Sequence, residues 1–155
     1  MRRCVAICVF IFLIFYNFIS QKKIIDEESG VVVTLTSHSE RILRSFATIE
    51  SIGIGKIRPQ KIILYLGNKY TNDPLPKNLE RLRTRGLEII FCNDVGPHTK
   101  YFPYVQSKSF FDYPLVTADD DKIYEKDWLD RLIKAWEADP NSVHCFRARK
   151  IIFDN

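Results

Sequence analysis

VVVTLT, at residues 31–36, decides the fold class, because it is a β-branched run in which apolar and polar residues do not alternate. Such a run is typical of a strand covered on both faces, as the strands of parallel sheets are. Apolar residues then recur at helical spacing from residue 42 to residue 52, and Gly53 ends the pattern. Ser37, with Glu40 three residues later, predicts a capping box at the start of that helix.

The same succession of strand and helix continues along the chain. Further strands are expected at 61–66, 87–92, 114–118 and 142–146, helices at 77–85 and 126–138, and a helical turn at 107–111. This order predicts an α/β, Rossmann-like fold with a mostly parallel sheet and helices on both faces. Ligands of such sheets bind beyond the carboxyl ends of the strands. Residues 37–41 and 119–121 each follow a strand, so we expect them to share one crevice.

The first 20 residues are apolar enough to suggest a membrane segment. Residues 4–19 read CVAICVFIFLIFYNFI and follow two arginines. They would span roughly 24 Å as a helix and lack the small residues of a cleavage site. We therefore expect an uncleaved, single-pass signal anchor at 1–20, with a cleaved signal peptide as the alternative. The arginines favour a cytosolic N-terminus, which in a eukaryote would place the rest of the chain in the lumen of the ER or Golgi.

Composition limits the remaining 135 or so residues to one domain, which we divide into a polar stem at 21–30 and a folded part at 31–155. Apolar residues make up 46% and charged residues 27% of the chain, which excludes disorder. The net charge of +4 is too small to indicate nucleic acid as a partner. Four cysteines without a C-x-x-C pair disfavour a zinc ribbon or a redox site.

The triplet Asp119-Asp120-Asp121, directly after a predicted strand, is the strongest chemical feature. Three adjacent carboxylates repel one another, and a bound divalent cation would remove that cost. Mn²⁺ and Mg²⁺ prefer such oxygen ligands. In an extended chain the first and third carboxylates project to one side and can share an ion or an ion-bridged diphosphate. The alternative is a solvated acidic turn that caps the next helix.

Four segments appear in the order VTLTSHSERI, RPQKIILYLG, GLEIIFCNDVGPHTKYFPY and PLVTADDDKIYEKDWLDRL. Together they resemble the GT-A glycosyltransferases, in particular the family-two-like polysaccharide and lipopolysaccharide transferases, over roughly residues 31–150. The resemblance implies a GT-A fold. It also implies an enzyme that transfers a sugar from a nucleotide-sugar donor, with UDP-sugars weakly favoured, to a glycan or another hydroxyl acceptor.

The resemblance further implies roles for individual residues. Asp121 would bind Mn²⁺ or Mg²⁺, and Asp119 would share the metal or contact the ribose. Lys100 would face the donor phosphates, where charge develops as the diphosphate leaves. The donor site as a whole would comprise Thr36, Ser37, Arg41, Lys100, Asp119 and Asp120. Arg41 and Lys100 can also be read as solvated surface residues.

In the family, the acceptor site and the general base usually come well after the D-x-D motif. No carboxylate after the triplet matches that base, so the catalytic residue stays unassigned. We therefore expect a C-terminally incomplete sheet that keeps the donor-binding half. Two alternatives to an active transferase remain open. One is a truncated, non-catalytic nucleotide-binding or partner module, and the other is a nucleotidyltransferase, which shares the fold and the use of metal.

Overall fold

The computed structural model describes residues 2–148 and contains a four-stranded sheet with strand order β3-β2-β1-β4. Every neighbouring pair is parallel. The strands are β1 (Val32–Thr36), β2 (Lys61–Gly67), β3 (Leu87–Cys92) and β4 (Leu115–Thr117). The α/β, Rossmann-like class and the parallel sheet are thus confirmed. The last seven residues of the expected domain at 31–155 lie outside the described residues.

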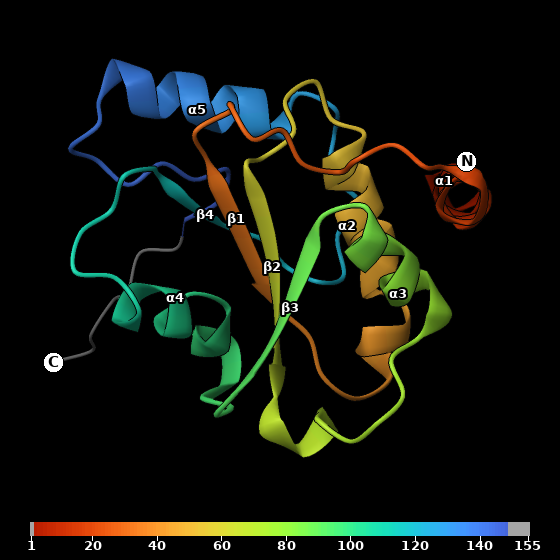
Figure 1. Cartoon of the computed structure of the whole chain (residues 1–155). Helices are drawn as coiled ribbons and strands as arrows, with labels where there is room; N and C mark the ends of the chain where they lie inside the picture. The colour runs from red at the N-terminus through yellow and green to blue at the C-terminus, as the bar shows by residue number, and fades with distance from the viewer. Residues whose placement is uncertain (1, 149–155) are drawn as a thin grey trace, which may run out of the picture.

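Within residues 2–148, five α-helices accompany the sheet (Figure 1). They are α1 (Arg2–Ile19), α2 (Ser45–Gly53), α3 (Lys77–Thr84), α4 (Phe102–Gln106) and α5 (Trp128–Ala138), and the short 3-10 helices are η1 (Ser39–Leu43), η2 (Asn68–Tyr70) and η3 (Gly96–Lys100). Helices α2, α3 and α5 share one hydrophobic core with the sheet, whereas α4 packs on a second cluster. Helices therefore lie on both faces, as expected.

The strand β1 is buried because both of its faces are covered. Val33 and Leu35 belong to the larger core, while Val32 packs with Ile63 and Tyr65 on the α4 side. This explains the absence of alternation in the sequence of this strand. Because β2 and β4 lie on opposite sides of β1, the order of the strands reverses between β1 and β4. Such a reversal opens a crevice at the carboxyl ends of the two strands, where ligands of open α/β sheets bind.

Helix α1 lies against α2 and α3 (Figure 1). Leu13 is fully buried, and Asn17 Nδ2 donates hydrogen bonds to Glu50 Oε1 at 2.9 Å and to the carbonyl oxygen of Asn78 at 3.2 Å. In the part of the chain that the structure describes, no helix has both the length and the apolar character needed to cross a membrane. The expected anchor at residues 1–20 therefore stays a prediction.

Three local predictions are wrong. Ser37 does not cap a helix, because its hydroxyl bonds Asp120, and η1 begins after His38 without a side-chain cap. The helical turn expected at 107–111 is absent, and helix α4 precedes that segment. Residues 142–146 form no strand, and Val143 is 96% exposed because no neighbouring strand pairs with it.

Candidate functional site

A cavity of about 610 Å³ opens at the carboxyl ends of β1 and β4, at the point where the strand order reverses. All seven residues assigned from the sequence line it: Thr36, Ser37, Arg41, Lys100, Asp119, Asp120 and Asp121. They come from the end of β1, from η1, from η3 and from the segment after β4. The structure thus brings together residues up to 85 positions apart, as the parallel topology predicts.

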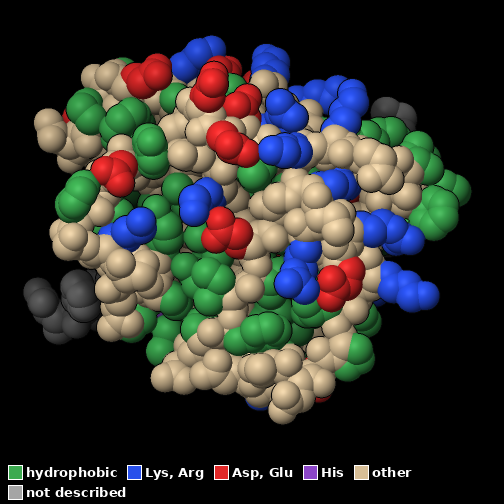
Figure 2. Space-filling model, viewed as in Figure 1, with side chains coloured by type: hydrophobic (Ala, Val, Ile, Leu, Met, Phe, Trp, Pro, Cys, Tyr) green, Lys and Arg blue, Asp and Glu red, His purple; other side chains and the backbone are tan. Residues whose placement is uncertain are grey.

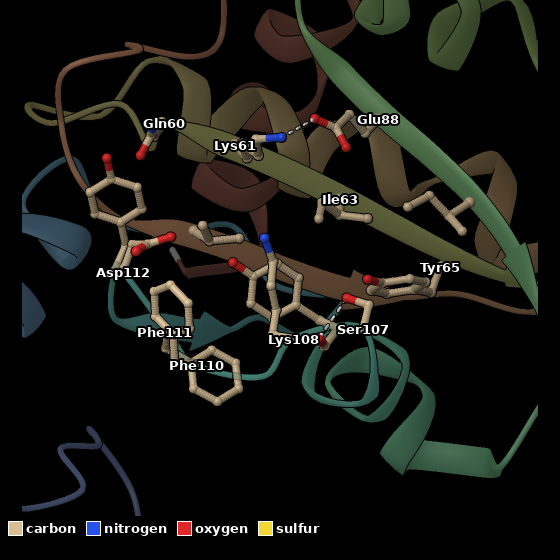
Figure 3. Close-up of a pocket in the computed structure, with 14 residues that line it drawn as sticks. Gln60, Lys61, Ile63, Tyr65, Glu88, Ser107, Lys108, Phe110, Phe111 and Asp112 are labelled. Atoms are coloured by element: carbon tan, nitrogen blue, oxygen red, sulfur yellow. Dashed lines mark hydrogen bonds and ion pairs between the residues drawn. The ribbon is translucent and has the colours of Figure 1, made fainter.

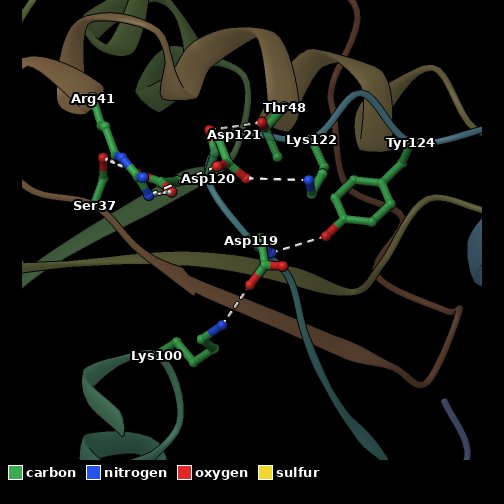
Figure 4. Close-up of polar contacts among 9 residues, drawn as sticks. All are labelled: Ser37, Arg41, Thr48, Lys100, Asp119, Asp120, Asp121, Lys122 and Tyr124. Atoms are coloured by element: carbon green, nitrogen blue, oxygen red, sulfur yellow. Dashed lines mark hydrogen bonds and ion pairs between the residues drawn. The ribbon is translucent and has the colours of Figure 1, made fainter. Parts of the chain in front are cut away.

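Asp120 is the buried member of the triplet, with a side chain 7% exposed (Figure 4). Its Oδ2 accepts a hydrogen bond from Ser37 Oγ at 2.6 Å, and its Oδ1 lies 3.5 Å from Arg41 Nη1. Its carbonyl oxygen accepts from Thr48 Oγ1 at 2.9 Å. Asp120 therefore ties the segment after β4 to the end of β1 and to α2, and it holds its two neighbours at the cavity.

Asp119 and Asp121 remain accessible, with side chains 56% and 48% exposed. Asp119 Oδ1 lies 2.6 Å from Lys100 Nζ, whereas Asp121 Oδ2 lies 3.7 Å from Arg41 Nη1. The two carboxylates point in different directions (Figure 4). The extended geometry expected from the sequence is not present, because the chain turns at residues 120–121 and each carboxylate is drawn to its own cation.

Tyr124 fixes the backbone beside the triplet. Its hydroxyl accepts a hydrogen bond from the backbone N–H of Asp119 at 2.8 Å, and its ring packs on Trp128 with centroids 4.0 Å apart. Burial, with a smaller contribution from the nearby carboxylates, raises the pKa of Tyr124 to about 12. The phenol is therefore neutral at physiological pH and adds no further negative charge to the cavity.

Thr36 is placed differently from its neighbours. Its hydroxyl donates a hydrogen bond to the carbonyl oxygen of Tyr65 at 3.0 Å, across the carboxyl ends of β1 and β2. The side chain reaches the cavity wall with its hydroxyl proton already engaged. Thr36 therefore shapes the wall of the site and still offers oxygen lone pairs as acceptors.

Sequence reasoning left four charged residues of the cavity unassigned: Lys69, Asp94, Lys122 and Arg147. Asp94 Oδ1 accepts hydrogen bonds from Gly96 N at 2.9 Å and from Thr99 Oγ1 at 3.3 Å. These bonds shape the loop that leads to Lys100, so Asp94 positions the cation that meets Asp119. The available signal was positional, because Asp94 follows β3 and Lys69 follows β2, at the carboxyl edge that carries the triplet.

The cavity offers oxygen ligands for a hard divalent cation. Among residues 2–148, no group of three or more His, Cys, Asp or Glu side chains is placed to hold a metal ion by itself. Asp119 and Asp121 nevertheless present two accessible carboxylates to one cavity. Mg²⁺ is commonly held by one or two carboxylates together with substrate phosphates and water. Asp119 and Asp121 are therefore the residues that would hold Mn²⁺ or Mg²⁺ together with a phosphate-bearing ligand, provided that their carboxylates, which point in different directions here, turn toward one ion.

A second cavity, of about 220 Å³, lies on the α4 face of the sheet between β2 and the loop after α4 (Figure 3). Aromatic side chains, including Phe110 and Phe111, form one wall, and the pair Lys61–Glu88, 3.3 Å apart, lies at the opposite side. Burial raises the pKa of Tyr65, on the floor, to about 12. None of the residues assigned from the sequence lines this cavity.

Comparisons with protein-family models, with curated proteins and with solved structures find no match to this chain.

Proposed function

We propose that this chain is the donor-binding domain of a metal-dependent glycosyltransferase of the GT-A type, which transfers a sugar from a nucleotide-sugar to a hydroxyl acceptor. One observation carries the proposal. The Asp119–Asp121 triplet shares a single cavity with Ser37, Arg41 and Lys100, at the edge where open α/β sheets bind nucleotides. The resemblance of the four sequence segments to this family points to the same chemistry.

The charges of the cavity suit a diphosphate that arrives with a divalent cation. Its described lining contains five cations and four carboxylates: Arg41, Lys69, Lys100, Lys122 and Arg147, with Asp94, Asp119, Asp120 and Asp121. In the free protein the accessible carboxylates and cations neutralise one another. Once Asp119 and Asp121 bind a cation, Lys100 and Arg41 lose these partners and can pair with phosphate oxygens instead. Binding of metal and diphosphate thus replaces the existing ion pairs Lys100–Asp119 and Arg41–Asp121 with new ones.

Each side chain has a distinct part in this proposal. Asp119 and Asp121 would hold Mn²⁺ or Mg²⁺, which as a Lewis acid neutralises the leaving diphosphate. Lys100 and Arg41 would orient the phosphates and stabilise the charge that develops on them. Asp120, engaged by Ser37 and Arg41, would keep the carboxylates on either side of it in place.

The test is the thermal transition of the full chain with UDP, GDP or CDP, each with and without Mn²⁺. A ligand that binds only the native state raises the midpoint by mass action. We expect a rise with one nucleotide, UDP being favoured, only when Mn²⁺ is present. Asp121→Asn should abolish the rise. Glu137→Gln, which removes one negative charge at an exposed position of α5, is the matched control and should leave it unchanged.

Adding nucleoside triphosphates and a UDP-sugar to this experiment, with an assay of transfer and hydrolysis, separates the alternatives. Stabilisation by a nucleoside triphosphate in preference to the UDP-sugar would favour a nucleotidyltransferase. Metal-dependent binding of UDP without transfer or hydrolysis of a UDP-sugar would favour a non-catalytic module of the same fold. A folded chain that no nucleotide stabilises, with or without metal, would refute the donor site.

A further inference from the structure

The outward side of α1 is an apolar surface that no other part of the described chain covers. Its large side chains are 44–69% exposed and recur every three or four residues along the helix. We call the outer face of α1 the side formed by Ile7, Ile11, Phe12, Ile14, Phe15, Phe18 and Ile19. Soluble monomers rarely expose so continuous a stripe of large apolar residues, and such a stripe usually marks a contact with a membrane or a protein.

The opposite side of the same helix is fixed to the domain. Leu13 is fully buried, the rings of Phe10 and Phe46 lie 5.9 Å apart, and Asn17 bonds the buried Glu50. These contacts hold α1 lengthwise against α2 and α3. The outer face is therefore presented as a long, flat stripe parallel to the domain surface.

Cations border the stripe. A groove at the C-terminal end of α1 is lined by Lys22, and a groove beside α3 is lined by Lys77 and Arg81; their described linings include no carboxylate. The guanidinium of Arg81 lies 4.8 Å from the ring centroid of Phe18, so it extends along the apolar surface. In Figure 2, hydrophobic side chains lie at the right-hand edge, where Figure 1 places α1, with Lys and Arg side chains beside them.

We propose that the outer face of α1 binds the surface of an anionic lipid bilayer, with the helix lying in the membrane plane and the domain attached to its other side. An interfacial helix buries its apolar face at the boundary between headgroups and acyl chains, and cations at its border attract anionic headgroups. Lys77, Arg81 and Lys22 are placed for that contact. This inference concerns a surface remote from the Asp119–Asp121 cavity and does not depend on the proposed function.

The charge of the border decides between a bilayer and a second copy of the chain. A symmetric dimer through the outer face would bring the same cations of both copies to one interface, where like charges repel. An anionic bilayer instead pairs them with phosphate groups. A helix that crossed the membrane would have to leave α2 and α3, which would break the bonds of Asn17 to Glu50 and Asn78.

The experiment is co-flotation of the full chain with vesicles of phosphatidylcholine, with or without phosphatidylserine. We expect flotation with the anionic vesicles, weaker flotation with phosphatidylcholine alone, and release by alkaline carbonate, which strips surface-bound proteins. Phe15→Asp should weaken partitioning roughly tenfold or more, because one large apolar side chain no longer enters the bilayer. Lys77→Glu should weaken binding by about fivefold or more and only to anionic vesicles.

Val143→Asp is the matched control, since it also places a carboxylate at an exposed apolar position, but one outside α1. It should float like the unchanged chain. Circular dichroism must show the same thermal transition for all variants, because each change is at an exposed site. Three results would overturn the proposal: a folded chain that stays with neither vesicle type, equal flotation of Phe15→Asp, or resistance to alkaline carbonate, which indicates a spanning helix. A dimer in solution that Phe15→Asp dissociates, without vesicle binding, would assign the face to a second copy.

Discussion

Two sets of ion pairs in this chain differ in burial, and the contrast separates structure from function. Between α2 and the end of α3, Glu50 and Arg85 are 0% and 3% exposed, and Arg85 Nη2 donates to Glu50 Oε2 at 3.0 Å. Around the cavity, the pairs Lys100–Asp119 and Arg41–Asp121 are accessible to water. The first set is sealed beneath α1, and the second lines an open cavity.

This difference in burial determines what each set can do. A buried charge that loses its partner pays a desolvation penalty with nothing to offset it, so Glu50 and Arg85 must stay together. An exposed pair is worth at most about 1 kcal/mol, because water solvates the separated charges nearly as well. In the cavity, the carboxylates can therefore leave their cations to bind a metal ion, and the cations can bind phosphates, at little cost in stability. Glu50 and Arg85 cannot change partners in this way.

The largest effect should follow from breaking the sealed pair. Glu50→Leu leaves the guanidinium of Arg85 buried without its carboxylate and removes one of the two acceptors of Asn17. We expect the free energy of unfolding to fall by about 3–5 kcal/mol, measured by urea denaturation.

The double variant Glu50→Leu/Arg85→Met is the control for that prediction. It removes both charges and should lose much less stability than the sum of the two single variants, because no uncompensated buried charge remains. Additive losses would show that the two residues act independently, contrary to the role assigned to the pair.

A smaller effect on stability is expected at Asp120, which is buried although it lies between the two accessible carboxylates of the cavity. Ser37→Ala removes the 2.6 Å hydrogen bond to Asp120 Oδ2. Hydrogen bonds to charged groups contribute about 1.5–3 kcal/mol, so unfolding should become easier by that amount. Ser109→Ala, at an exposed position without a side-chain hydrogen bond in the described structure, should stay within about 0.5 kcal/mol. Equal effects of the two changes would contradict the anchoring role of Ser37.

The sheet could be predicted from the sequence because a strand that is covered on both faces requires an uninterrupted run of β-branched and aliphatic residues. The same kind of signal failed at residues 142–146, since a strand also needs a partner, which a local pattern does not contain. Ser37 was misread for a related reason. Its capping pattern is local, whereas the group that takes its hydroxyl lies 83 residues away.

The candidate site was predictable where chemistry and position coincided. The Asp119–Asp121 triplet and Ser37 each follow a strand, and parallel strands end at one edge, so their meeting follows from the topology alone. Asp94 and Lys69 occupy similar positions but lack a distinctive motif. Asn17 looked like a single polar interruption in an apolar segment, and only the packed structure shows that it bonds Glu50. Burial and long-range partners were the missing information.

The smallest effect on stability should come from the exposed pairs, and it tests the contrast most directly. Lys100→Ala removes the cation 2.6 Å from Asp119, yet it should change the free energy of unfolding by no more than about 1 kcal/mol. Lys134→Ala, which breaks the exposed 2.9 Å pair with Asp130 on α5, is the matched control and should cost about the same. The two variants should differ in nucleotide binding. Lys100→Ala should weaken the Mn²⁺-dependent binding of UDP by about tenfold, the loss of one charge-assisted hydrogen bond to phosphate, while Lys134→Ala should bind normally. Calorimetric titration with UDP in the presence of Mn²⁺ measures the affinity of both variants. A marked loss of stability in Lys100→Ala would mean that the pairs of the cavity are as structural as the sealed pair, and unchanged UDP affinity would contradict the contact of Lys100 with the donor phosphates.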